Sequence, residues 1–394
     1  MQQRPKPGTR PANRRSLILE AATALFAVRG YEHVSISDIA AEVAVGPSAL
    51  YRHFPGKEQL LAEVIGQVAD EFTAMLAERA GEAADSEEAG ATDILTVCAA
   101  FTLDHRSTGV LFEREARHLS PDTYATVLAR IRAARSAFAA AVTRSVPDTD
   151  PTTARAALSV ILSPSFHRTS LPRPAYDRHL AALAGRTLAA ALPPAPGPAV
   201  EPTGLRRSST RDALVTAAVR LFADRTYTGT GMEDVAAAVG MAPSSLYNHL
   251  PNKSDVLLTA LTRADGYLQL TLDGILARSS DAMSALGSLV DSYAAFAVQF
   301  PALVDVLVTE VRNLPGESAE ALQKAQREFI GEWVHLLRQS HPDLDLPTAR
   351  VTVQAALMMI NDMSRSPGLR SRSDAVPALS RLGRAVLSAP TVNE

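Results

Sequence analysis

The chain has 394 residues, of which 46% are apolar and 21% are charged, and this is the composition of an ordinary globular protein with more than one core. No apolar run approaches the roughly 20 residues of a membrane helix and no secretory signal is recognisable, so we expect a cytoplasmic protein without membrane contact. The single cysteine, Cys98, has no disulfide partner and no ligands at zinc spacing, so metal sites, redox chemistry and cofactors are not predicted.

Basic residues are concentrated at the start of the chain. Residues 1–60 hold eight Lys or Arg against five Asp or Glu, a surplus of three within a chain whose net charge is −3. Residues 1–14 are predicted to form a basic arm that continues into Arg15, and a shorter equivalent precedes the middle of the chain at Arg206, Arg207 and Arg211. Such arms are typical of contact with phosphates or the minor groove, although cationic leaders are also often only solvated.

The segment 15–61 is repeated without a gap as 211–257, with twenty identical positions. The repeat continues later in the chain, because Glu115, Arg117 and Leu119 in EARHL match Glu310, Arg312 and Leu314 in EVRNL. A unit that occurs twice, each time followed by a long and different tract, is no solenoid repeat. The chain is therefore interpreted as a tandem duplication whose two halves share one fold.

Each copy predicts a helix-turn-helix. In the first copy, apolar residues at helical spacing predict a helix over 15–29, which Gly30 ends, and Ser35 to Asp38 form a capping signature for a second helix. Pro47 and Pro243 suit the first turn of a short third helix, because that position needs no N–H. Lys57 and Lys253 then begin long helices.

The rest of the chain is also predicted to be helical, so the fold class is all-α. The acidic segment 81–93 is expected to be a solvated loop, and the Pro-rich segment 191–207 an interdomain linker. The expected domains are a basic arm (1–14), a first helix-turn-helix domain (15–61), a first helical regulatory domain (62–190), the linker, a second helix-turn-helix domain (208–257) and a second helical regulatory domain (258–390).

Both copies resemble the DNA-binding domain of the TetR family of bacterial repressors, and the strings LYRHFPGK and LYNHLPNK carry much of this resemblance. The first copy departs from the family pattern at Ala44, where glycine is usual in the turn, and the second departs at Thr226. The resemblance implies a three-helix DNA-binding head and a larger helical domain that binds a ligand and dimerises. No enzyme activity is expected.

The resemblance places the third helix of each head in the major groove of double-stranded operator DNA. The residues predicted to contact DNA are Arg14, Arg15, Ser35, Gly46, Pro47, Ser48, Ala49, Tyr51, Arg52, His53 and Lys57 in the first half, and Arg206, Arg207, Arg211, Ala242, Pro243, Ser244, Ser245, Tyr247, Asn248, His249 and Lys253 in the second. Among these, the Tyr, His and Lys positions resemble the family's phosphate clamps. The alternatives without a DNA-binding role are that these tyrosines pack against the core of the head and that these histidines make local hydrogen bonds at a helix end.

The two heads differ at the positions that would contact bases. Gly46 aligns with Ala242, Ala49 with Ser245 and Arg52 with Asn248. A symmetric homodimer presents one reading helix twice, whereas this chain presents two different ones. The sequence therefore predicts that one polypeptide acts as a pseudo-dimer on an asymmetric operator, with half-sites roughly 34 to 36 Å apart, or one helical turn of DNA further if the heads are spread. Further association of two chains stays open.

Large apolar and polar residues in the helical domains are candidates for a ligand pocket, although plain core or interface packing is the simpler interpretation. They are Phe101, His105, Phe112, Arg117, Tyr124 and Phe166 in the first half and Tyr293, Phe296, Phe300, Arg312, Phe329, Trp333 and Met359 in the second. The runs ARAALSVIL and VTVQAALMMI are expected to pack against each other as an intramolecular four-helix interface.

The resemblance implies a repressor that an effector releases from DNA, and the apolar helical domains favour a hydrophobic effector such as a lipid, an acyl thioester or a sterol-like compound. Tandem proteins that resemble this chain are linked to lipid or steroid metabolism. Two other classes remain open: a helical carrier or enzyme for hydrophobic metabolites with vestigial heads, and a protein that coats DNA without sequence preference. No nucleophile and base pair or phosphate-binding glycine loop favours an enzyme.

Overall fold

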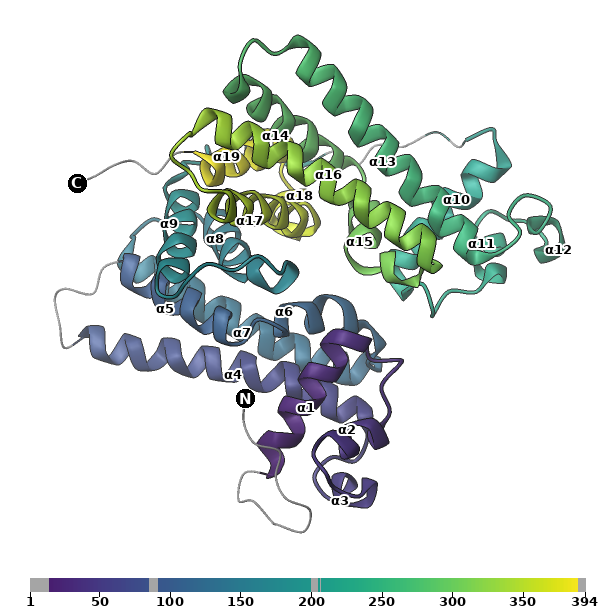
Figure 1. Cartoon of the computed structure of the whole chain (residues 1–394), viewed down its shortest axis with the longest axis horizontal. Helices are drawn as coiled ribbons and strands as arrows, with labels where there is room; N and C mark the ends of the chain where they lie inside the picture. The colour runs from purple at the N-terminus through teal and green to yellow at the C-terminus, as the bar shows by residue number, and fades with distance from the viewer. Residues whose placement is uncertain (1–13, 85–90, 200–204, 206, 389–394) are drawn as a thin grey trace. The chain divides into compact units, whose positions relative to one another are not determined.

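A computed structural model of the chain describes residues 14–84, 91–199, 205 and 207–388, and these residues form helices and connecting turns (Figure 1). The first half contains α1 (Arg14–Arg29), α2 (Ile36–Glu42), α3 (Pro47–Tyr51), α4 (Lys57–Ala84), α5 (Ala91–Asp104), α6 (Thr108–Val110), a π-helical turn (Leu111–Glu115), a 3₁₀ turn (Ala116–His118), α7 (Pro121–Ser145), α8 (Pro151–Leu162), a second 3₁₀ turn (Ser163–Phe166) and α9 (Ala175–Ala189). The all-α prediction is confirmed.

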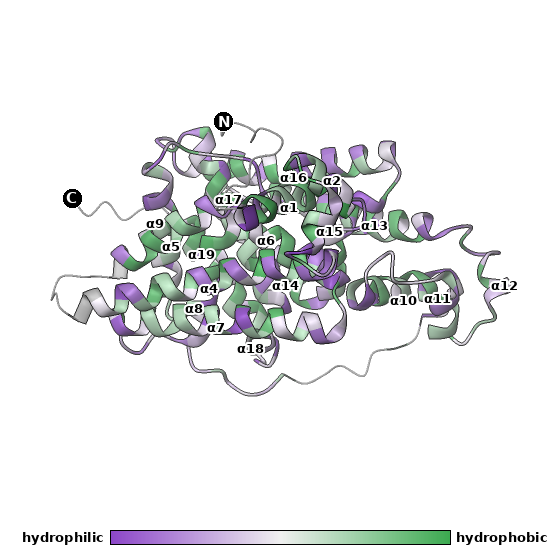
Figure 2. Ribbon diagram, turned by 90° about the horizontal axis from the view of Figure 1, so that it is seen from below, coloured by the Kyte–Doolittle hydropathy of each residue, from purple (hydrophilic) through white to green (hydrophobic). Residues whose placement is uncertain are grey.

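The second half repeats this order. It contains α10 (Thr210–Arg225), α11 (Met232–Ala238), α12 (Pro243–Leu246), α13 (Lys253–Arg278), α14 (Ala282–Gln299), α15 (Pro301–Thr309), a 3₁₀ turn (Val311–Asn313), α16 (Gly316–Ser340), α17 (Leu346–Arg365), α18 (Pro367–Arg370) and α19 (Ala375–Leu387). Hydrophobic and hydrophilic residues both occur along these helices (Figure 2), as expected for helices with one buried side and one exposed side.

The predicted helix starts are accurate, whereas the predicted acidic loop is too long. Both long helices begin at the expected lysines, Lys57 and Lys253, and both short third helices begin at their prolines. The segment 81–93 is helical at both ends, because α4 continues to Ala84 and α5 begins at Ala91. Charged and alanine-rich residues have good helix propensity, so low apolar content alone did not indicate a loop.

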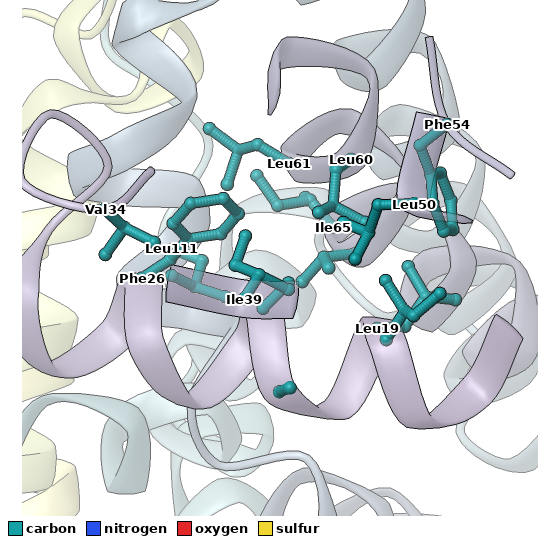
Figure 3. Close-up of a cluster of buried hydrophobic side chains, with 14 of the residues drawn as sticks. Leu19, Phe26, Val34, Ile39, Leu50, Phe54, Leu60, Leu61, Ile65 and Leu111 are labelled. Atoms are coloured by element: carbon teal, nitrogen blue, oxygen red, sulfur yellow. The ribbon is translucent and has the colours of Figure 1, made fainter. Parts of the chain in front are cut away.

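Each head has its own apolar core, made of α1, α2, α3 and the start of α4 in the first half (Figure 3). Phe26, Ile39, Leu50 and Leu61 are almost completely buried in it, and Leu111 joins the cluster from the π-helical turn after α6. The core of the second head repeats this arrangement, and Val306 and Leu314 enter it from beyond the head. The heads are therefore packed continuously onto the helices that follow them.

The described residues group into two compact units. The first reaches Thr149 and includes Pro164–Arg168, and the second holds Asp150–Ser163 and everything from Thr169 onward. This division cuts through the expected first regulatory domain. The reason is that α8 and α9, although they belong to the first sequence repeat, pack with helices of the second repeat.

A four-helix interface lies inside the second unit: α8 packs on α9 and α17, and α19 packs on α9 and α17. Small residues such as Ala156, Ala157, Ala355 and Ala356 are fully buried there and let the backbones approach closely. This packing confirms the expected pairing of ARAALSVIL with VTVQAALMMI. Helices of the two sequence repeats thus share one core.

Polar contacts also cross this interface. The Asp362 carboxylate accepts hydrogen bonds from Arg155 Nη2, at 3.0 Å, and from the Ser159 hydroxyl. The Arg186 guanidinium donates to the carbonyl oxygens of Ala385 and Val386 at the end of α19. Such directional contacts fix the register of helices whose apolar faces alone would allow sliding.

The described part of the linker lies on the second unit instead of spanning open solvent. Ala199 N donates to Ser371 O at 2.8 Å and Ser373 N to Gly197 O at 3.0 Å, while Arg372 Nη2 reaches the carbonyl oxygen of Pro193. Arg372 is itself buried and paired with Asp374. The linker is thus anchored before it reaches residue 200.

Within the described residues, no single helix has both the length and the apolarity to cross a membrane. α14 and α15 reach them only as a pair, which is bent by 97° at the break.

Two turn positions in each head have positive φ, and the heads distribute glycine between them in opposite ways. After the first helix, Gly30 has φ 82° and its counterpart Thr226 has φ 71° with ψ 161°. Between the second and third helices, Ala44 has φ 53° and its counterpart Gly240 has φ 74°. Both departures from the family pattern therefore keep a positive φ and accept strain, which is greater for the β-branched Thr226.

We expect Thr226→Gly to stabilise the second head by roughly 1 kcal/mol, because glycine relieves a backbone conformation that costs other residues about 1–3 kcal/mol. Part of the gain is offset because the Thr226 hydroxyl accepts from Gly229 N at 3.1 Å. The matched substitution Gly30→Thr should destabilise the first head. Calorimetric unfolding of both variants measures this, and a Thr226→Gly variant that unfolds at lower temperature would show that Thr226 is not strained.

Acid should weaken the four-helix interface through His179. Its Nε2 lies 2.9 Å from Thr352 Oγ1, and burial and the nearby charge of Arg186, partly opposed by Asp345, lower its pKa to about 4. Above about pH 6.5 the imidazole is neutral in both the folded and the unfolded protein, so its burial does not lower stability. As the pH drops from 6.5 toward the folded pKa, the unfolded protein binds a proton that the folded protein does not, and the free energy of unfolding falls by up to roughly 3 kcal/mol. Denaturation at pH 7.5, 6 and 5 should show this slope, and His179→Gln should flatten it; equal slopes would contradict it.

Candidate nucleic-acid interface

The third helix of each head is very short and is held by residues on its inner side. α3 has five residues and α12 has four. Leu50 and Phe54 bury the inner side of the first, and Leu246 and Leu250 bury the inner side of the second. A helix of one turn has little stability of its own, so these anchors determine where its outer side chains lie.

The outer face of each third helix is exposed. Tyr51 is 56% exposed and Tyr247 is 52% exposed, which rules out the alternative that they are core residues. The other exposed members of the predicted set are Gly46, Pro47, Ser48, Arg52 and His53 in the first head and Ala242, Pro243, Ser244, Ser245, Asn248 and His249 in the second, while Ala49 is half-buried. Each head therefore presents its predicted reading residues on one free surface.

The turn before the third helix is the same in both heads. Val45 N donates to Ala40 O at 2.9 Å, and Met241 N donates to Ala236 O at 2.9 Å. Each bond closes a turn that contains the positive-φ residue, Ala44 in the first head and Gly240 in the second. The change from glycine to alanine has therefore not altered the turn.

Ser35 lies at the start of α2 and caps it. Its hydroxyl accepts from Asp38 N at 3.1 Å, and Asp38 Oδ2 accepts from Ser35 N at 2.8 Å, which completes a capping box. The Ser35 hydroxyl also holds the pKa of Asp38 below its usual range. The capping prediction is confirmed, and the predicted DNA contact of Ser35 remains a prediction.

Lys57 and Lys253 point toward their own heads. Lys57 Nζ donates to Tyr31 O at 2.9 Å and lies 4.1 Å from the centre of the Tyr31 ring. Lys253 Nζ donates to Tyr227 O at 2.8 Å and lies 4.4 Å from that ring. Burial lowers the pKa of Lys57, and nearby Glu32 partly opposes this. In this geometry both lysines brace the turn after the first helix, and the predicted phosphate contact of Lys57 and Lys253 remains a prediction.

The basic arms are only partly described. Arg206 and residues 1–13 lie outside the described residues, whereas Arg14 begins α1. Arg15 donates to Glu63 Oε1 at 2.7 Å, Arg211 to Thr259 Oγ1 at 3.3 Å, and Arg207 lies 3.6 Å from Asp212. Exposed pairs of this kind contribute less than about 1 kcal/mol to stability, so a DNA phosphate can replace the present partner of each arginine.

The sequence did not assign the residues that connect the first head to the helices after it. Glu115 is fully buried, and its Oε2 accepts from Tyr31 N at 2.8 Å. Glu58 Oε1 accepts from Ser120 N at 2.9 Å, and the Ser120 hydroxyl lowers the pKa of Glu58. The match between EARHL and EVRNL was the one sequence signal that pointed to Glu115.

The structure separates the candidate ligand residues of the first half. Phe101 stacks on His105 with ring centres 4.3 Å apart and also contacts Phe72. Phe112 and Tyr124 instead pack against the core of the first head. Arg117 lies in the 3₁₀ turn after Glu115, and Phe166 in the later 3₁₀ turn. In these contacts the residues fall into separate groups, and their role in ligand binding remains a prediction.

In the second half the candidate residues form a connected aromatic cluster. Tyr293 contacts the rings of Phe296, Phe329 and Trp333 at 5.8 to 6.3 Å, and Phe296 contacts Phe300. The Tyr293 hydroxyl donates to Asn361 Oδ1 at 2.9 Å, and Trp333 Nε1 is buried with no hydrogen-bond partner. Met359 is buried in α17, and Arg312 lies apart in the 3₁₀ turn.

A surface groove of about 440 Å³ lies between the end of α16 and the start of α17. It is lined by Gly331, Val334, His335, Arg338, Gln339, Pro342, Leu346 and Arg350. None of the predicted ligand residues lines it, so the groove and the aromatic cluster are different places on the second half.

Comparison with known proteins identifies the heads. The model of bacterial regulatory proteins of the tetR family matches residues 18–64 and 214–260. The chain is 36% identical over 66 residues to the HTH-type transcriptional repressor KstR2 of Mycolicibacterium smegmatis, covering 17% of this chain and 32% of that one. It is 26% identical over 120 residues to KstR2 of Rhodococcus jostii, covering 30% and 58%. The chain thus spans about a third and somewhat over half of these relatives.

Among solved structures, a TetR-family regulator from Bordetella parapertussis aligns with a TM-score of 0.44 and 23% identity, covering 46% of this chain and 96% of that one.

The bracing role of the lysines predicts that Lys57→Met destabilises the first head by about 1–2 kcal/mol, because the carbonyl of Tyr31 loses its charged donor and keeps the longer bond from Val34 N at 3.3 Å. Lys253→Met should do the same in the second head. Arg52→Ala, on the exposed face, should change stability by no more than about 0.5 kcal/mol. Thermal unfolding of the three variants measures this, and a Lys57→Met protein as stable as Arg52→Ala would show that Lys57 is not a brace.

Proposed function

Because the chain carries two DNA-binding domains of the tetR family of bacterial regulators in tandem, we propose that it is a transcriptional repressor that binds double-stranded operator DNA with both heads. α3 and α12 enter the major groove, where Arg52 and Asn248 face base edges. The observation that carries this proposal is the exposed outer face that both heads build on a buried leucine.

Phosphate contact is assigned to the residues that are both exposed and shared by the two heads. Tyr51 and His53, with Tyr247 and His249, are identical between copies and face solvent in both. Groups of this kind fix the register and orientation of a protein on the duplex, and they carry no sequence information of their own. Arg14, Arg15 and Arg211 extend this contact from the first helices.

We assign the role of a dimer to a single chain. In support, α8 and α9 of the first repeat share a core with α17 and α19 of the second, and Arg155 pairs with Asp362 across it. A homodimer would bring two equal copies to such an interface. Here the partner is already present in the same polypeptide, so the heads bind as a pseudo-dimer without a second chain.

The operator is then asymmetric. The positions that differ between the exposed faces are the ones assigned to base contact, namely Gly46 or Ala242, Ala49 or Ser245, and Arg52 or Asn248. An arginine donates to guanine O6 and N7, whereas an asparagine pairs with adenine N6 and N7. The half-site under the first head should therefore favour guanine where the other favours adenine.

A hydrophobic effector, such as a lipid, an acyl thioester or a sterol-like compound, is proposed to release the DNA. The aromatic cluster around Tyr293 and Trp333 supports a site in the second half, because its rings suit an apolar ligand and the unpartnered Trp333 Nε1 can donate to a carbonyl. The effector must bind better when the heads are wrongly placed for DNA, since equal affinity for both states shifts nothing. The relatives named KstR2 are repressors, which agrees with this direction of control.

Selection of bound duplexes from a random pool tests the proposal. Wild-type protein should select two unlike half-sites, and Arg52→Asn should change the base preference in one half only, at a cost of about 1–3 kcal/mol on the original operator. The matched control Asn248→Ala should act on the other half. A selected site that is a perfect inverted repeat would contradict the asymmetric pseudo-dimer.

The same operator separates the other classes of protein. A regulator should prefer it to a scrambled duplex at every salt concentration, whereas a coating protein should bind both equally and a carrier or enzyme should bind neither. Changing Tyr51, His53, Tyr247 and His249 together to alanine should abolish binding while leaving the fold intact. If that variant bound as well as wild type, these four side chains would not be the clamps.

A further inference from the structure

The surface groove between α16 and α17 is basic, although the chain as a whole is acidic. Among the eight residues that line it, Arg338 and Arg350 are cationic and His335 can become so, and none of the eight is an Asp or Glu. The whole chain has a net charge of −3. Like charges repel each other, so a groove of this kind favours an anion between its cationic groups.

The equivalent positions of the first half do not carry this cluster. With the offset of 195 residues, Ala140 matches His335 and Thr143 matches Arg338. No gap disturbs this match, because α7 and α16 both have 25 residues. The basic side chains of α16 are therefore specific to the second half, and the fold that the two halves share does not require them.

Arg350 has an arginine as its equivalent, Arg155, but the two arginines have different surroundings. Arg155 Nη2 donates to Asp362 Oδ1 at 3.0 Å across the four-helix interface. At the position that matches Asp362, the first half has His167, so the repeat supplies no carboxylate for Arg350. Among the residues that the structure describes, Arg350 has no ion-pair partner, and it is exposed. One copy of this arginine is thus used inside the protein, and the other lines the groove.

Arg338 is held at the groove by the turn between the two helices. Its Nε donates to the Leu344 carbonyl oxygen at 3.1 Å, and this bond does not use the two Nη groups. The acid that Arg338 acts on is Asp345, whose Oδ1 accepts from Thr348 N at 2.7 Å at the start of α17. This bond, more than the charges of His179 and Arg338, lowers the pKa of Asp345. One carboxylate already engaged in capping does not balance two guanidinium groups.

The rest of the groove is largely apolar. Val334 is buried, whereas Pro342 and Leu346 are exposed. The volume of about 440 Å³ lies within the range of small-molecule sites, which is about 300–1,000 Å³. The groove therefore offers two guanidinium groups and an apolar wall to the same ligand.

We propose that this groove binds an organic phosphate, a small molecule with a dianionic phosphate group and an apolar part. Arg338 and Arg350 donate to the phosphate oxygens, because the paired N–H groups of a guanidinium match that geometry. A carboxylate has a single charge and would leave one guanidinium unmatched. The apolar part of the ligand lies against Val334 and Leu346. This site is separate from the aromatic cluster, and it does not depend on the repressor function.

Titration calorimetry of the full chain with phenyl phosphate tests the site at pH 8, where a phosphate monoester is dianionic. Phenyl phosphate should bind more tightly than benzoate, which has one charge, and more tightly than inorganic phosphate, which lacks the ring. Arg338→Gln and Arg350→Gln should each weaken its binding roughly ten- to hundredfold, as expected for the loss of hydrogen bonds to a charged group. Arg327→Gln is the matched control, because it removes the same charge from an exposed position of α16 outside the groove.

Leu346→Ala tests the apolar wall separately from the charges. It should weaken phenyl phosphate roughly three- to tenfold and leave inorganic phosphate unchanged, because only phenyl phosphate has a ring to bury. Thermal unfolding establishes that each variant is folded, which is expected because the substituted side chains are exposed. The proposal is overturned if wild-type protein shows no saturable binding of phenyl phosphate, or if Arg327→Gln weakens it as much as Arg338→Gln does.

Binding of DNA by the same variants distinguishes a small organic phosphate from the phosphates of a duplex. The double variant Arg338→Gln, Arg350→Gln should bind the operator as wild type does while it loses phenyl phosphate. If it loses the duplex instead, and wild type ignores phenyl phosphate, the groove contacts DNA and the proposal is wrong. A chain that binds phenyl phosphate in the groove but no duplex would refute the proposed repressor and leave this site standing.

Discussion

Each reading helix depends on the burial of one leucine. α3 and α12 contain five and four residues, too few for a helix to persist by itself, and Leu50 and Leu246 connect them to the cores of their heads. The contact of this leucine with the core, together with the preceding turn, determines where the outward side chains of the helix lie. A change in either core therefore moves Tyr51 or Tyr247 as surely as a change at the DNA surface would.

The turn explains why the two heads could diverge without losing this geometry. Its positive-φ position is alanine in one head and glycine in the other, yet the bond from Val45 N to Ala40 O has an equal in Met241 N to Ala236 O. The strain at Ala44 and Thr226 is small compared with the apolar cores that hold these turns. Sequence identity was thus free to fall while the backbone stayed the same.

Much of this architecture could be predicted from the sequence. The duplication, the helix starts at Pro47 and Lys57, the capping box of Ser35 and the pairing of α8 with α17 follow from spacing, propensity and capping chemistry. The direction of a long flexible side chain does not, because the position of Lys57 at the start of its helix does not show that its ammonium donates to the carbonyl of Tyr31. The single hydrogen bond from Tyr31 to Glu115, residues 84 positions apart, was not predicted, because it leaves no periodic pattern of the kind that indicated the pairing of α8 with α17. Composition also could not show that the aromatic residues of the second half form one cluster while Phe112 and Tyr124 pack on the core of the first head.

The only tryptophan of the chain is Trp333, and it packs against Tyr293 and Phe329 in the aromatic cluster of the second half. Its indole is shielded from water and has neighbouring rings on more than one side, so its emission depends on how those rings are arranged. The protein therefore carries a built-in optical reporter within the unit that α8 and α9 of the first half share with the second half. Light emitted by the unmodified molecule reports on the packing around α16 without any label.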